Sequence, residues 1–64
     1  MYALTQTEKE IEDEVFRIYA VEAEGKIIMD FTTDREFAKK VVKLLNENGV
    51  EINHAVDVIE DLVY

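Results

Sequence analysis

Hydrophobic and polar residues alternate in the middle of the chain, and this alternation predicts two β-strands. The strands cover residues 15–23 and 26–32, and Glu24-Gly25 joins them, because glycine can adopt the positive φ that a tight hairpin turn needs. With a two-residue loop, directly opposed residues share one face of the hairpin. We therefore expect one face to point into the core, and it carries Phe16, Ile18, Ala20, Ile27, Met29 and Phe31.

The same register defines a second set of side chains on the other face of this hairpin. It places Ala20 opposite Met29 and gathers Tyr19, Val21 and Ile28 on the other face. If the helices cover the first face, this apolar patch meets water unless something else covers it. Two accounts stay open: the N-terminal segment folds over the patch, or the patch is a surface for self-association or for a partner.

A helical periodicity follows the second strand. Thr33 is expected as the N-cap, because Glu36 stands three residues later and completes a capping box. Gly49 is expected to end the helix in a left-handed conformation. The apolar arc of this helix contains Phe37, Ala38, Val41, Val42, Leu44 and Leu45. A basic stripe lines one edge of the opposite arc and consists of Arg35, Lys39 and Lys43.

The last part of the chain predicts a second helix. After the first helix, the apolar residues Val50 and Ile52 are expected to return the chain toward the core, and Asn53 can cap the helix that follows. The apolar arc contains Ala55, Val56, Val58, Ile59, Leu62 and Val63. The acidic face lies opposite and consists of Asp57, Glu60 and Asp61, with His54 at the boundary.

The first fourteen residues are acidic and carry a weaker pattern. Tyr2, Leu4 and Ile11 are spaced among polar residues, which leaves two structures open: a third, edge strand that runs into Val15, or an acidic, partly ordered segment. Residues 15–64 are expected to form a single domain. Two helices on one face of a small antiparallel sheet satisfy these patterns, so we predict an α+β fold of order ββαα, or βββαα if the N-terminal segment pairs.

Length and composition narrow the class of protein. A chain of 64 residues forms one domain, and at this size only about 60% of the unfolded surface becomes buried, so the stability margin is thin. The absence of cysteine excludes disulfides and thiolate zinc sites, which leaves oligomerisation as the expected remedy. The N-terminal residues lack a signal-peptide pattern, and no apolar run is long enough to span a membrane. We expect a soluble, cytoplasmic homo-oligomer that holds no cofactor.

The net charge of −8 argues against direct nucleic-acid binding, because such proteins neutralise phosphates with lysine and arginine. The acidic residues are concentrated near both ends of the chain, whereas the basic cluster lies in the first predicted helix. Most acidity of this kind serves solubility. A further hypothesis is that the acidic ends imitate nucleic acid and occupy a nucleic-acid-binding protein as a decoy.

The candidate chemistry is confined to the second predicted helix. His54, Asp57 and Asp61 stand at i, i+3 and i+7, and such side chains fall within about 60° of arc on a helix. One imidazole and two carboxylates suit a divalent metal ion, although an ordinary solvated helix face has the same pattern. The chain has no serine, no cysteine nucleophile and no glycine-rich phosphate loop. We therefore expect a protein that is not an enzyme.

The C-terminal run His54-Ala55-Val56-Asp57-Val58-Ile59-Glu60-Asp61-Leu62 resembles the closing signature of a family of short uncharacterised proteins from anaerobic Gram-positive bacteria. Tyr19-Ala20-Val21 and 30–34 are similar to two other family segments, and the likeness spans roughly residues 17 to 63. Ala20, Ala55 and Leu62 depart from the family pattern. The resemblance implies no activity, and it directs attention to His54, Asp57, Glu60 and Asp61.

These observations give three functional hypotheses. The first is a non-enzymatic protein-interaction or regulatory domain that acts as a homodimer through Tyr19, Val21 and Ile28 and through its acidic helix. The second is a divalent-metal-binding protein whose ligands are completed by another subunit. The third is the acidic decoy.

Overall fold

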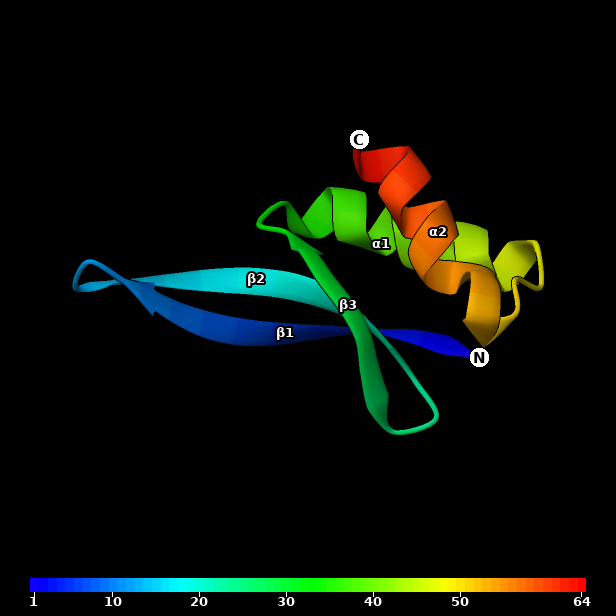
Figure 1. Cartoon of the computed structure of the whole chain (residues 1–64), viewed down its shortest axis with the longest axis horizontal. Coiled ribbons are helices and arrows are strands. Elements are labelled where there is room, and N and C mark those ends of the chain that lie inside the picture. Colours follow the sequence, from blue (N-terminus) through cyan, green and yellow to red (C-terminus); the bar gives the residue numbers. More distant parts are fainter.

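Three antiparallel strands and then two helices make up the chain in a computed structural model that describes all 64 residues (Figure 1). The sheet has the order β1-β2-β3, so β2 is the central strand. The bounds are Tyr2–Ile11 for β1, Glu14–Ala23 for β2, Lys26–Thr32 for β3, Arg35–Glu47 for α1 and Ile52–Val63 for α2. The predicted α+β class is confirmed, and the N-terminal segment forms an edge strand.

The register between β2 and β3 differs from the predicted one. It begins as expected with Ala23 opposite Lys26, but the pairing then slips twice, and Ala20 comes to lie opposite Asp30 instead of Met29. Each slip leaves one extra residue in β3, which is the mark of a β-bulge. Because a one-residue slip moves side chains to the other face of a strand, the predicted division into a core face and a free face holds only in part. Ala20 is buried and Met29 and Phe31 pack against the core as predicted, but Val21 and Ile28 from the predicted free face also lie there.

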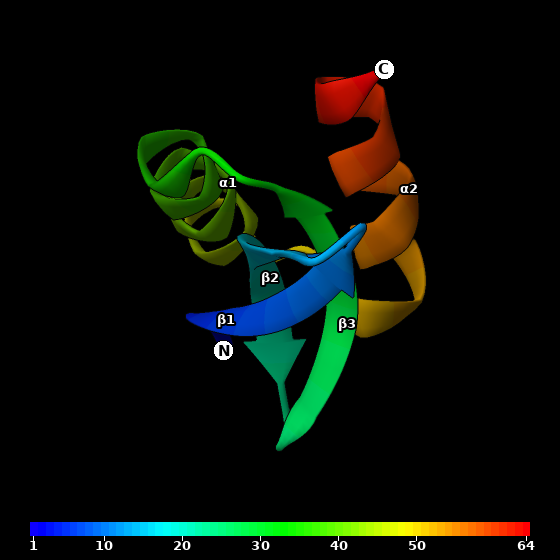
Figure 2. The same ribbon diagram turned by 90° about the vertical axis from the view of Figure 1, so that its left-hand side faces the viewer.

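The two helices pack on the sheet face that carries Val21 (Figure 2). Val21 is fully buried, whereas Phe16 and Ile27, which the regular register placed in the core, are exposed. The core cluster consists of Tyr2, Val21, Ala23, Val41, Leu45, Ala55 and Ile59. Alanines allow the helices to approach the sheet closely, but they bury little apolar area each, so the core stabilises the fold only modestly.

The helix ends follow the sequence in part. Gly49 has a φ of +57° and ends α1 as expected. The N-cap of α1 is Asp34 instead of Thr33, because the Asp34 carboxylate accepts a hydrogen bond from the Phe37 N–H. The predicted cap of α2 is also wrong: this helix begins at Ile52, and its N-cap Glu51 makes no side-chain capping bond.

A long-range clamp fastens the start of β1 to the end of α1. The Asn46 side chain accepts a hydrogen bond from the Tyr2 N–H at 2.7 Å and donates one to the Tyr2 carbonyl at 2.9 Å. The Tyr2 hydroxyl donates to the Val50 carbonyl at 2.6 Å. Burial raises the pKa of this hydroxyl, and the negative charges of Glu24 and Glu51 raise it further.

Candidate functional site

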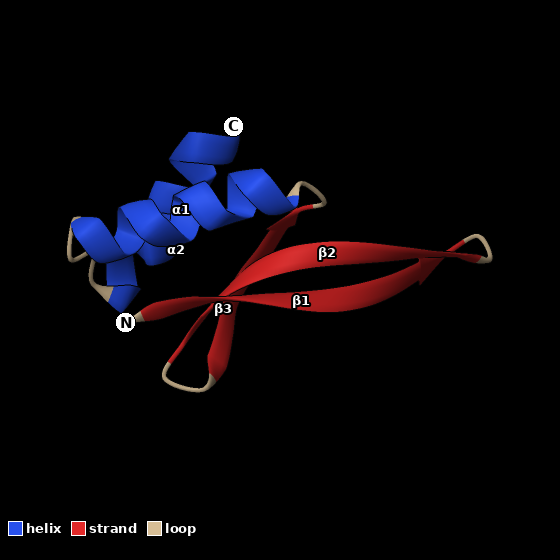
Figure 3. Ribbon diagram, turned by 180° about the vertical axis from the view of Figure 1, so that it is seen from behind, coloured by secondary structure: helices blue, strands red, loops and turns tan.

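The hairpin of β1 and β2 extends well beyond β3 and the helices (Figures 1 and 3). β3 pairs with β2 only between Tyr19 and Ala23, so the earlier part of β2 has no strand on that side. β1 is an edge strand along its whole length. We name residues 8–17 the projecting hairpin. Its two strands leave backbone N–H and C=O groups unpaired on both outer edges, which is the usual template for pairing with another chain.

The projecting hairpin combines apolar and acidic side chains. Ile11, Val15 and Phe16 are exposed on it. The acidic residues Glu10, Glu12, Asp13 and Glu14 are exposed around the same tip. None of these carboxylates forms an ion pair, since the only ion pairs in the molecule are Lys9 with Asp30 and Lys39 with Glu36. The pairing of Ile11 with Glu14 and of Lys9 with Phe16 places Ile11 and Phe16 on one face of the hairpin and Val15 on the other. The tip therefore presents apolar side chains on both faces, among carboxylates that have no ion-pair partner.

The turn at the end of the projecting hairpin contains two residues with left-handed backbones. Glu12 has a φ of 51° and Asp13 a φ of 68°, a combination that two-residue hairpin turns normally assign to Asn-Gly or Gly-Gly. A side chain in this region costs about 1–2 kcal/mol per residue. The chain thus places two carboxylates at the tip where glycine or asparagine would give a more stable turn.

A small apolar groove lies between α1 and α2. It has a volume of about 120 Å³ and is lined by Phe37, Lys40, Val41, Leu44 and Leu62. Leu44 and Leu62 are exposed at this groove, and Lys40 is its only charged lining residue. The predicted basic stripe of Arg35, Lys39 and Lys43 is exposed on the same helix. Of the four cationic side chains of α1, only Lys39 has an ion-pair partner, Glu36 at 3.9 Å.

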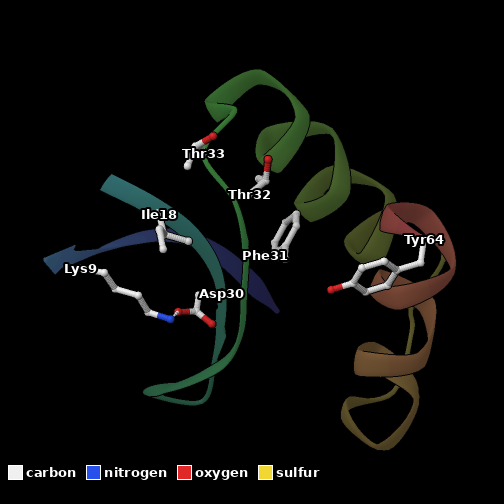
Figure 4. Close-up of a pocket in the computed structure, with 7 residues that line it drawn as sticks. All are labelled: Lys9, Ile18, Asp30, Phe31, Thr32, Thr33 and Tyr64. Carbon is white, nitrogen blue, oxygen red and sulfur yellow. Dashed lines mark ion pairs between the residues drawn. The ribbon is translucent and has the colours of Figure 1, made fainter. Parts of the chain in front are cut away.

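A larger, more polar hollow of about 470 Å³ lies beside β3 (Figure 4). The ring of Tyr64 forms one side, and the Lys9 ammonium and the Asp30 carboxylate lie across from it at 3.2 Å from each other. The remaining lining residues are Ile18, Phe31, Thr32 and Thr33. Because its two charged groups neutralise each other, this hollow presents no uncompensated charge to a ligand.

The interaction patch expected from the sequence is not a surface of the protein. Val21 has 0% of its surface exposed and lies at the centre of the core, and Tyr19 and Ile28 are half-buried. Ile28 packs against the core cluster because it is the extra residue at one β3 bulge. The account in which this patch is an exposed association surface is therefore wrong. In the other account the N-terminal segment covers the patch, and Tyr2 does lie in the same core cluster as Val21, although both helices contribute to that cluster as well.

The candidate metal ligands and the acidic face lie on the outside of α2. His54, Asp57 and Asp61 are exposed, as is Glu60. The structure gathers no group of three or more histidine, cysteine, aspartate or glutamate side chains that could hold a metal ion. The basic stripe of α1 and the acidic face of α2 form no ion pair with each other.

Sequence reasoning missed the residues that the projecting hairpin exposes. Phe16 was expected in the core, and Ile11 was expected to cover the sheet or to lie in a partly ordered segment. The available signal was a two-residue spacing of β-branched or apolar residues, in Thr5, Thr7 and Ile11 before Glu12-Asp13 and in Phe16, Ile18 and Ala20 after it. It was weak because the turn contains no glycine, asparagine or proline.

Comparison with protein-family models, with curated proteins and with solved structures finds no match to this chain. Neither α1 nor α2 is long and apolar enough to cross a membrane.

Proposed function

We propose that this chain is a non-enzymatic, cytoplasmic protein-interaction domain that self-associates as a homodimer through its projecting hairpin. The observation that carries the proposal is the exposure of Ile11, Val15 and Phe16 on a hairpin that extends away from the rest of the fold. The contact surface is thus moved from the predicted patch around Val21 to residues 8–17.

The physical argument concerns the stability of the projecting hairpin. A two-stranded ribbon without a third strand or a covering helix is marginally stable in water. Its apolar side chains gain about 25 cal/mol for each Å² of apolar surface that a partner removes from water. Only nine residues of the domain are buried, so its own free energy of unfolding is small. Stabilisation by a partner is therefore a large fraction of the total stability of the folded chain.

Self-association also has to overcome charge. Two copies that each carry a net charge of −8 repel one another over most orientations, more strongly at low salt. A stable dimer therefore needs an apolar contact or a local pairing of opposite charges.

The metal-binding hypothesis and the decoy hypothesis remain predictions, because the exposed side chains of α2 make no contact that favours either. Membership of the family that the C-terminal run resembles also remains a prediction.

The test compares two isoleucines that are equally exposed on strands. Ile11 has 55% of its surface exposed on the projecting hairpin, and Ile27 has 53% exposed on β3. Sedimentation equilibrium of Ile11→Thr should give a dissociation constant about tenfold weaker than that of the parent chain, from the lost apolar burial. Ile27→Thr should leave it unchanged. A parent chain that stays monomeric at high concentration, or equal effects of both substitutions, would overturn the proposal.

A further inference from the structure

We propose that the groove between α1 and α2 receives the projecting hairpin of a second copy of this chain. This inference rests on the proposed function, because it takes self-association through residues 8–17 as given and names the surface on which they dock. It commits to one occupant, the tip of a second copy, for reasons of size, charge and reach.

Size argues for a side chain as the occupant. Pockets for small molecules usually measure about 300–1,000 Å³, whereas this groove measures about 120 Å³. Four of its five lining residues are hydrophobic, so it favours an apolar group. The exposed aliphatic side chains at the tip, Ile11 and Val15, are groups of this kind.

Charge argues for this chain's own tip. The tip carboxylates Glu12, Asp13 and Glu14 have no ion-pair partner, and neither does Lys40, which lines the groove. Lys43, three residues after Lys40 on α1, is also unpaired. The chain has 7 basic against 15 acidic residues, and α1 holds the basic cluster. Docking the tip at the groove therefore pairs the negative end of one copy with the positive helix of another, and it reduces the repulsion that other orientations suffer.

Reach excludes the hairpin of the same chain. The projecting hairpin points away from both helices (Figures 1 and 3), so a tip cannot fold back into its own groove without unpairing the sheet. In a closed two-fold dimer the contact is made twice, with each copy supplying one tip and one groove. In this arrangement the exposed tip and the apolar groove of one chain are each covered by the other chain.

The first test substitutes the groove. Leu62 has 43% of its surface exposed in the groove, and Ile52 has 38% exposed at the other end of α2. Leu62→Gln should weaken self-association about tenfold in sedimentation equilibrium, because it removes apolar surface from the docking site. Ile52→Gln should leave it unchanged. If Ile11→Thr weakens association but Leu62→Gln does not, the proposed function stands and the groove is not the docking site.

The second test reverses charge on each side of the contact. Glu12→Lys/Glu14→Lys places lysines at the tip, and Lys40→Glu/Lys43→Glu places carboxylates at the groove. Each double variant alone should be monomeric, because both of its contacts join like charges. An equimolar mixture should associate, because each tip then meets an opposite charge. Both variants keep a net negative charge, so bulk attraction cannot cause this rescue.

The outcomes separate the two proposals. Rescue in the mixture, with circular dichroism showing that each variant is folded, supports docking of the tip in the groove. Association of either variant alone at the parent's strength, or no rescue in the mixture, overturns the groove assignment and leaves the hairpin-based function to the isoleucine comparison. A parent chain that never associates overturns both.

Discussion

Substitution of Asn46 by alanine should destabilise the fold far more than its exposed position suggests. The change removes both hydrogen bonds between the Asn46 side chain and the Tyr2 backbone, which join residues 44 positions apart. Each such bond contributes about 0.5–1.5 kcal/mol, so the expected cost is about 1–3 kcal/mol. A domain of this length has roughly 3–10 kcal/mol of stability in total, and the loss is a large fraction of it.

The control is another asparagine at the same end of α1. The Asn48 side chain donates to the Leu44 carbonyl at 2.8 Å, a local and exposed bond within the helix. Asn48→Ala should therefore cost less than about 1 kcal/mol. Urea denaturation followed by far-ultraviolet circular dichroism measures the free energy of unfolding of both variants and of the parent chain. The proline-free, cysteine-free chain offers no isomerisation or disulfide step that would complicate the transition.

Asn46→Asp gives a second measure of the same clamp. The carboxylate can still accept from the Tyr2 N–H, but its other oxygen faces the Tyr2 carbonyl, where the amide nitrogen donated. We expect this variant to be at least as unstable as Asn46→Ala at neutral pH. Equal stability of Asn46→Ala and Asn48→Ala, within about 0.5 kcal/mol, would refute the clamp as a stabilising contact.

Three further predictions concern the turn, the register and pH. At a concentration where the chain is monomeric, Glu12→Asn with Asp13→Gly should raise the melting temperature, because it relieves about 1–2 kcal/mol of left-handed strain at each position; no rise in calorimetry would contradict this account of the turn. In urea denaturation, Ile59→Ala should lower the free energy of unfolding by about 2–5 kcal/mol and Ile27→Ala by less than about 1 kcal/mol. A larger loss for Ile27→Ala would indicate that Ile27 lies in the core, as the regular register predicts. The raised pKa of Tyr2 means that its stabilising contribution is complete below the ordinary value of about 10 and is lost as pH rises through the folded value. Tyr2→Phe should be less stable at neutral pH and lose less stability on alkaline titration; parallel pH profiles would refute this.

The parts of the fold that local chemistry determines were predictable from the sequence. Glu24 and Gly25 form the two-residue turn, both with positive φ, and Gly49 ends α1. The apolar arcs of both helices contain the residues that become buried, Ala38, Val41, Leu45, Ala55 and Ile59. These features depend on contacts between residues close in sequence, which periodicity and capping patterns describe well.

The register of β3 depends on tertiary packing, so the sequence did not reveal it. Three consecutive apolar residues, Ile27, Ile28 and Met29, allow either face to turn toward the core, and the bulges decide in favour of Met29 opposite Val21. The interaction patch was predicted wrongly for the same reason, because the regular register placed Val21 on the free face of the sheet. The clamp was equally hidden, because Asn46 lies in the last turn of α1 and nothing local to it indicates a partner at Tyr2.

A disulfide trap tests the central claim most directly, since the chain has no cysteine of its own. Chains with Ile11→Cys and chains with Leu62→Cys are mixed in equal amounts and oxidised, and Ile27→Cys mixed with Leu62→Cys is the control at matched exposure. If the projecting hairpin docks in the groove of a second copy, the first mixture gives a mixed disulfide dimer well above the control yield. Equal yields in the two mixtures would contradict the account.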